Sequence, residues 1–190
     1  MGKYSAYYNN LIKRVIDNSN ASTWEKAVLE WEMYDCEEDT ELASSCLCGK
    51  EDLRYLFTIR NSQNGNMLYP IGSSCIKKFN RSDLNESVSI KEQLFKLLHA
   101  IKSNEFITLS NKLFSRKLLA YLYESGAFKP SPYNRYDPEE DYEFMLMMFN
   151  KRDKGSVSEA QNRKVRAIIM SSIRPYLQHV LHDRAACSLV

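Results

Sequence analysis

The sequence predicts an α+β protein with two N-terminal helices, a β-hairpin stapled by cysteines, and a mainly helical C-terminal half. Apolar residues recur at helical spacing near the N-terminus and again through most of the chain beyond residue 85. Between these regions, two short runs suited to strands flank a turn that contains Asn64-Gly65. We therefore expect two domains, residues 1–84 with the hairpin and residues 85–190 with the helices.

The first helix is predicted over residues 4–17, where Leu11 and Val15 share an apolar stripe. Ser22-Thr23-Trp24-Glu25 has the pattern of a capping box and predicts a second helix that includes Trp31. The acidic residues that follow are interpreted as a loop.

The hairpin is predicted from strands at residues 53–60 and 67–71, joined by a turn at residues 61–66. Asn64-Gly65 supplies the positive φ that tight hairpin turns need. A short helical turn follows at residues 75–79, and the polar stretch 80–87 marks the predicted boundary.

The C-terminal half contains several helix signals. Capping boxes are predicted at residues 89–92 and 156–159, and Asp137-Pro138 has the N-cap and first-turn proline of a third helix. Gly126 is expected to end a helix, and Pro175 to break or kink the last one.

Three cysteines are the strongest chemical signal. Cys46-Leu47-Cys48-Gly49 precedes the hairpin and Cys75 follows it, so that folding back the strands brings three thiols together. Zinc prefers four N or S ligands in tetrahedral arrangement, which makes the hairpin a zinc-stapled element and zinc the expected cofactor. Alternatives are three buried, inert cysteines or a disulfide.

The fourth ligand is open. Cys36 is the first candidate because a short loop separates it from Cys46; His99, the Asp52 carboxylate or a water are the others. We expect a structural site, because neighbouring residues do not resemble the surroundings of catalytic zinc.

The composition is that of a globular protein. The 190 residues are 44% hydrophobic and 26% charged, a balance that suits a packed core. The N-terminal residues lack the apolar segment of a signal peptide, and no long apolar run suggests a membrane span. We therefore expect a cytoplasmic protein without a membrane partner, in which cysteines serve metals or cores.

Charge is divided unevenly. Residues 1–95 carry 11 basic and 14 acidic side chains, whereas residues 96–190 carry 15 and 10. An acidic run precedes the cysteines and consists of Glu30, Glu32, Asp35, Glu37, Glu38, Asp39 and Glu41. Such runs often only form a solvent-exposed charged face, but they can also provide docking sites for proteins.

Basic and aromatic residues point to nucleic acid as a partner. On the last long helix, arginines are expected on one side and apolar residues on another; lysines follow Cys75, and tyrosines in a proline-rich loop can stack on unpaired bases. The candidate nucleic-acid-binding residues are Arg163, Arg166, Arg174, Lys77, Lys78, Tyr133, Arg135 and Tyr136.

Catalytic signatures are weak. The sequence contains no glycine-rich phosphate loop, no H-E-x-x-H helix and no G-x-S-x-G elbow. Cys75 as a nucleophile competes with its use as a metal ligand. An enzyme is therefore the less favoured class.

The region from Trp31 to Phe79 resembles uncharacterised small zinc-ribbon-like proteins of low-GC Gram-positive bacteria, their phages and mobile elements. The residues that carry the resemblance are Cys46-x-Cys48-Gly49, Asn61, Gly65, Ile71-Gly72-Ser73-x-Cys75-Ile76 and Phe79. Related patterns often have a histidine where this chain has Lys50. The resemblance implies zinc binding and phage or mobile-element biology, and implies no activity.

Together these patterns predict a non-enzymatic nucleic-acid-binding accessory protein stabilised by a structural zinc. The alternative is a protein-interaction module, or an inhibitor of a host defence or replication enzyme, that uses the acidic run as its surface.

Overall fold

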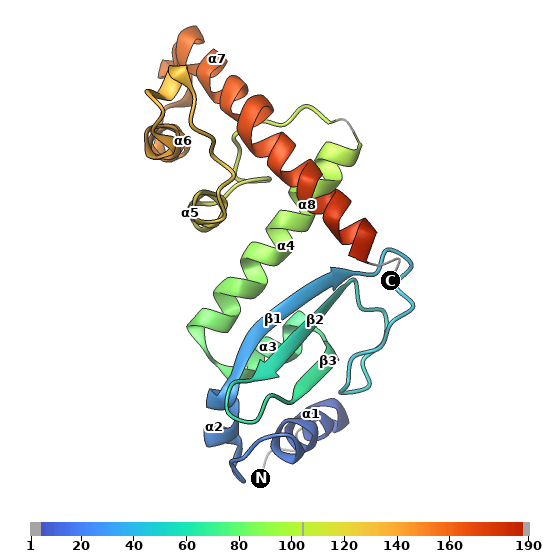
Figure 1. Cartoon of the computed structure of the whole chain (residues 1–190). Coiled ribbons are helices and arrows are strands. Elements are labelled where there is room, and N and C mark those ends of the chain that lie inside the picture. The colour runs from blue at the N-terminus through green and yellow to red at the C-terminus, as the bar shows by residue number, and fades with distance from the viewer. Residues whose placement is uncertain (1–4, 104, 188–190) are drawn as a thin grey trace. The chain divides into compact units, whose positions relative to one another are not determined.

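The computed structural model describes residues 5–103 and 105–187, with only the backbone described at 154 and 181–187 (Figure 1). The chain forms two compact units, Met1–Glu92 and Gln93–Val190. The first combines helices with a three-stranded sheet and the second is helical, so the α+β class and the mainly helical C-terminal half are confirmed.

Two helices open the first unit. Helix α1 (Ala6–Asp17) buries Leu11 and Val15, as the apolar stripe predicts. The second is much shorter than expected: α2 (Trp24–Ala27) passes into the 3₁₀ turn η1 (Val28–Glu30), and the Thr23 side chain makes no capping hydrogen bond. The helical residues end before Trp31, which already belongs to a strand.

The sheet contains three antiparallel strands in the order β1 (Trp31–Glu38), β2 (Tyr55–Asn61) and β3 (Met67–Ile71), so that β2 lies in the centre (Figure 1). The predicted hairpin is the β2–β3 pair. Gly65 in its turn has φ +78°, the conformation that favours glycine. The interpretation of the acidic run as a loop was wrong for its first part, because Glu32 to Glu38 lie in β1.

A β-bulge in β1 interrupts the pattern by which this strand could be recognised in the sequence. The register shifts between Met33 and Asp35, leaving Tyr34 as an extra, exposed residue. Buried positions before the bulge, such as Trp31, are therefore out of phase with Cys36 after it. The strict alternation that identifies a half-buried strand is lost.

A buried polar network joins η1, β2 and the turn before α2. Asn61 donates from Nδ2 to the Glu30 carboxylate (2.6 Å), which also accepts hydrogen bonds from the backbone N–H groups of Asn20 and Ala21. Burial of Glu30 raises its pKa, but these hydrogen bonds outweigh it, so the pKa lies below its usual value. Glu30 is thus a structural residue.

After β3, helix α3 (Ser73–Ile76) and the 3₁₀ turn η2 (Lys77–Phe79) form the predicted helical turn and bury Ile76 and Phe79. Helix α4 (Ser82–Lys102) begins upstream of the capping box expected at Ser89 and continues through the division between the units. The polar stretch before Ser89 is therefore largely helical.

The second unit contains α5 (Arg116–Glu124), the 3₁₀ turn η3 (Pro132–Asn134), α6 (Pro138–Asn150) and the turn η4 (Lys154–Ser156). Asp137 caps α6 as predicted, accepting a hydrogen bond from the N–H of Glu139. Gly126 follows α5 with φ +74°. In the core of the helices, Asn134 donates to the Asp141 carboxylate, which also faces Lys164 at 3.4 Å.

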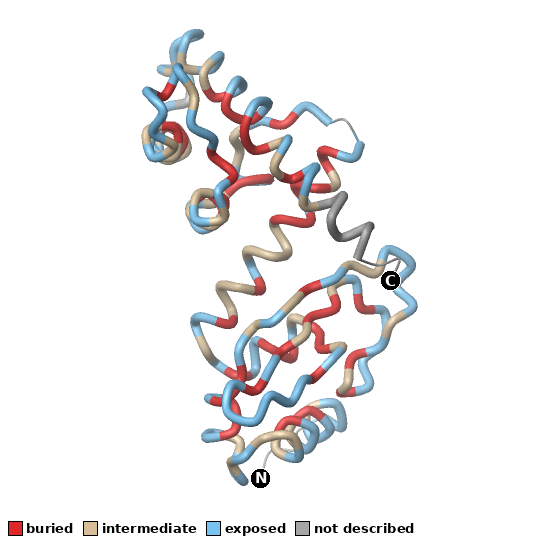
Figure 2. Tube along the Cα trace, viewed as in Figure 1, coloured by how far each residue is buried: buried red, intermediate tan, exposed pale blue. Residues whose placement is uncertain are grey.

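The last helical segment runs through α7 (Glu159–Ile168), the π turn η5 (Ile169–Ile173) and α8 (Arg174–Cys187). From Val165 to Ile173, buried positions recur at helical spacing, at residues 165, 168, 169, 172 and 173 (Figure 2). The expected break at Pro175 does not occur. Proline lacks an N–H and clashes with the carbonyl four residues earlier, and a π turn at that place relieves the conflict.

Among the helices of the described residues, none combines the length and apolar character that a transmembrane span requires.

Candidate metal centre

Residues 46–50 form a tight turn, the cysteine knuckle. The N–H of Cys46 donates to the carbonyl of Lys50, and the N–H of Gly49 donates back to the carbonyl of Cys46, both at 2.7 Å. Gly49 adopts φ +97°, which L side chains rarely accept. The Gly after Cys48 is therefore required by the turn itself.

The knuckle is fastened to its neighbours. The Leu47 N–H donates to the carbonyl of Pro70 in β3, and Asn10 of α1 donates from Nδ2 to the carbonyl of Cys48 (3.1 Å). The strand and the helix together fix the positions of the first two thiols. Asn10 was not recognised in the sequence, because an exposed asparagine on a helix carries no local signal.

Three buried thiols meet at this point. Cys75 Sγ lies 3.7 Å from Cys46 Sγ and 3.4 Å from Cys48 Sγ, and all three sulfur atoms lie within 4.8 Å of one another. These distances exceed the roughly 2.05 Å of a disulfide bond, and the cysteines are free. They match the edge of about 3.8 Å that tetrahedral zinc with Zn–S bonds of about 2.3 Å would impose. The arrangement can hold a metal ion.

Gly72 places the third cysteine. Its N–H donates to Cys46 Sγ (3.3 Å), and an added Cβ would stand 3.0 Å from Leu53 Cδ2. That contact is tighter than real Cβ atoms normally show, so glycine permits the close approach. Cys75 then follows in the first turn of α3.

The thiols are electrostatically coupled. The hydrogen bond between the Cys46 and Cys75 sulfur atoms, together with the N–H of Gly72, lowers the pKa of Cys46 below its usual value. The same hydrogen bond, together with burial and the neighbouring sulfur charge, raises the pKa of Cys75. A bound cation would favour the deprotonated form of the thiols that coordinate it.

The structure places Cys36 outside this group. Cys36 lies in β1 opposite Phe57 of β2, which in turn lies opposite Ile71 of β3. Two interstrand spacings of about 4.8 Å each separate Cys36 from the strand that leads to Cys75. Asp52 is exposed with φ +60°, and neither it nor His99 belongs to the described group of three.

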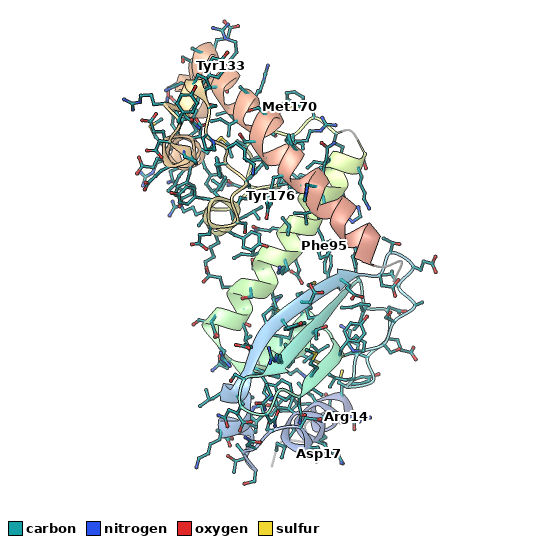
Figure 3. The ribbon with its side chains drawn as sticks, viewed as in Figure 1. Arg14, Asp17, Phe95, Tyr133, Met170 and Tyr176 are labelled. Atoms are coloured by element: carbon teal, nitrogen blue, oxygen red, sulfur yellow. The ribbon has the colours of Figure 1, made fainter. Side chains whose placement is uncertain are left out.

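An open groove of about 580 Å³ runs between α1 and the knuckle. It is lined by Lys13, Arg14 and Asp17 of α1 and by Cys46 and its neighbours. Figure 3 labels Arg14 and Asp17 on this helix. Lys13 and Asp17 form an exposed ion pair (2.6 Å), so the groove carries mixed charge next to Cys46.

The predicted arginines lie on the last helical segment. Arg163 and Arg166 are exposed on α7, whereas Val165 and Ile168 are buried. Arg174 is half-buried, and its Nη1 contacts the Met170 sulfur at 3.9 Å. On α7, the exposed arginines therefore lie away from the buried apolar residues.

The remaining predicted residues are exposed but differently engaged. Lys78 places Nζ over the Tyr8 ring at 4.7 Å from its centre, and Lys77 is exposed beside it on η2. In the proline-rich loop, Tyr133 and Tyr136 are 92% and 68% exposed, but Arg135 is paired with Glu140. That pairing also raises the pKa of Arg135.

Several members of the acidic run have partners within their own unit. Glu30 is buried with Asn61, Glu37 accepts from the Tyr69 hydroxyl, and Glu38 pairs with Arg54. Asp39 accepts from the Ser44 hydroxyl and N–H, which lowers its pKa. Glu32 and Glu41 are exposed.

No protein-family model, no curated protein and no solved structure matches the chain.

Proposed function

We propose that the chain is a non-enzymatic nucleic-acid-binding protein whose N-terminal unit is stabilised by a structural zinc ion. The observation that supports binding is the series Arg163, Arg166 and Arg174 along one helical segment, in which Arg163 and Arg166 are exposed and Arg174 is half-buried. Phosphates bind such series of guanidinium groups through charge and paired hydrogen bonds.

The net charge of the second unit adds to this support. Residues 93–190 contain 15 basic and 10 acidic side chains, an excess of five positive charges. Arg163 is paired with Glu159 at 3.3 Å, but both side chains are largely exposed. Such pairs contribute only about 0.3–0.5 kcal/mol, so a phosphate can replace the carboxylate at small cost.

The zinc proposal rests on the three buried thiols at tetrahedral spacing. Thiolate ligands favour zinc over calcium and magnesium, because calcium and magnesium prefer oxygen ligands. A buried centre fastened to β3 and α1 is suited to holding the unit together. The fourth position is taken by a water or another donor outside the group of three.

The test is binding of labelled single- and double-stranded oligonucleotides at about 50 mM salt, where electrostatic binding is strong. Replacing Arg163, Arg166 and Arg174 together by glutamine should weaken binding and reduce the slope of log affinity against log salt by roughly 0.7–0.9 for each lost phosphate contact. Thermal stability should change little.

A matched control removes the same charge elsewhere in the unit. Lys112, Lys117 and Lys129 are all exposed, and their replacement by glutamine should leave most of the affinity intact. If both triple variants lose affinity equally, only net charge matters and the arginine series is not a site. If the wild type retains no nucleic acid at low salt, the proposed function is wrong.

A further inference from the structure

A small cavity opens beside the arginine series in the second unit. It has a volume of about 160 Å³. Its apolar floor includes Met148 and Val165, and its rim includes Thr108, Asn162, Phe106 and Arg166. Ordinary ligand pockets occupy roughly 300–1,000 Å³, so this one suits a single flat ring system and not a larger molecule.

Phe106 is the unusual member of this rim. Its side chain is 70% exposed, although a phenylalanine normally contributes to a core. The guanidinium carbon of Arg166 lies 5.3 Å from the centre of its ring. The cation is thus held against one part of an aromatic surface that otherwise faces solvent.

The rim also carries hydrogen-bonding groups. Asn162 is exposed at the cavity, and asparagine amides pair with the donor and acceptor edges of bases. Thr108 adds a hydroxyl. An apolar floor, an aromatic wall, an amide and an arginine are together the chemistry that binds a nucleobase beside its phosphate.

Building on the proposed function, we infer that this cavity receives one unpaired base of a single-stranded nucleic acid, which stacks on Phe106 while Arg166 and Arg174 contact the flanking phosphates. A base within a duplex is stacked on both sides and is not available to the cavity. We therefore expect the protein to prefer single strands, with the base stacked on Phe106 and not on Tyr133 or Tyr136.

The experiment compares a fluorescein-labelled oligothymidylate of about twelve nucleotides with a duplex of the same length, a length that falls within the usual site sizes for single strands. Phe106→Ala should weaken binding of the single strand by roughly 5- to 150-fold, the range that stacking of one base provides. The salt slope should stay unchanged, because no phosphate contact is removed. Phe106→Trp, which keeps an aromatic ring, should bind the single strand about as tightly as the wild type.

Tyr34→Ala is the matched control, because Tyr34 is an exposed aromatic side chain that belongs neither to the cavity nor to the candidate nucleic-acid-binding residues. It should leave binding unchanged, and Tyr133→Ala (Figure 3) tests the proline-rich loop separately. Because Phe106 is exposed, its replacement should not alter the melting temperature, and this should be measured for each variant.

The outcomes separate the two proposals. Equal affinity of the wild type and Phe106→Ala for the single strand, or an equal loss for single strand and duplex, overturns the base cavity and leaves the arginine series standing. Loss of binding in Tyr133→Ala alone transfers stacking to the proline-rich loop. If the wild type binds neither probe, both proposals fail.

Discussion

The Sγ atom of Cys75 lies 3.4 Å from the Sγ atom of Cys48, although the residues are 27 positions apart in the chain. This approach joins the knuckle before β2 to the helical turn after β3, so β2 and β3 lie inside the loop that a metal would close. The order of the sheet and the integrity of the centre should therefore be linked.

We expect the purified protein to contain about one zinc ion per chain. Cys75→Ala should abolish stoichiometric zinc and unfold the sheet region, because structural zinc contributes roughly 10–16 kcal/mol of apparent binding free energy in small domains. Elemental analysis and circular dichroism measure the two effects. Metal-free protein from a preparation without chelator, with an unchanged Tm for Cys75→Ala, would refute the prediction.

Cys36→Ala provides the matched comparison, because Cys36 is as deeply buried as the cluster but lies two strands away. We expect this variant to retain zinc and to lose only the packing of one sulfur atom, on the order of 1 kcal/mol. Loss of zinc would instead identify Cys36 as the fourth ligand and require β1 to move when the ion binds.

Glu30 should make the first unit sensitive to acid. Its pKa in the fold lies below the usual 4.5, so its stabilising effect is fully present above that value and is lost as the pH falls through the lower folded-state pKa. Glu30→Gln should reduce the free energy of unfolding at pH 7 by roughly 1–3 kcal/mol. Urea denaturation at several pH values should show that the difference in free energy of unfolding between the wild type and Glu30→Gln becomes smaller below a pH of about 4.

Glu32→Gln is the control for that experiment, since Glu32 is an exposed neighbour of Glu30. It should change stability little at either pH. A Glu30→Gln curve that runs parallel to the wild type from neutral to acid pH would show that the hydrogen bonds to Glu30 do not depend on its charge.

Within the acidic run, we expect Asp39→Asn to lower the Tm and Glu41→Gln to leave it unchanged. Asp39 holds the turn before the knuckle through Ser44, whereas the Glu41 side chain is exposed. Tests of the acidic run as a docking surface should therefore neutralise Glu32 and Glu41. A defined protein partner that binds the wild type and is lost in that double variant would favour the interaction-module account over nucleic-acid binding.

The sequence was sufficient to predict features with local causes. The helix of Leu11 and Val15, strand β3 and the Asp137 cap all follow from periodicity or from turn chemistry within a few residues. The meeting of three cysteines could also be predicted, because the Asn64-Gly65 turn determines that the flanking strands return.

Features that depend on distant contacts could not be predicted. The bulge in β1 interrupts the alternation typical of a strand. The strand is positioned by the hydrogen bond between Glu30 and Asn61. It is also positioned by Arg81, which donates to the carbonyls of Val28 and Trp31. The exposure of Phe106 is equally invisible, because an isolated phenylalanine in a sequence is expected in a core.

The π turn at Ile169–Ile173 determines which arginines share a line along the last helical segment. An uninterrupted α-helix turns about 100° per residue, so Arg174 would stand about 80° round the axis from Arg166 and nearly in line with Arg163. A π turn accommodates about one additional residue. This rotates Arg174 by about 100° around the helix axis and brings it to within about 20° of Arg166. The backbone irregularity thus aligns Arg174 with Arg166, which lines the cavity, and a one-residue deletion in this turn would rotate the two cations apart without changing either side chain.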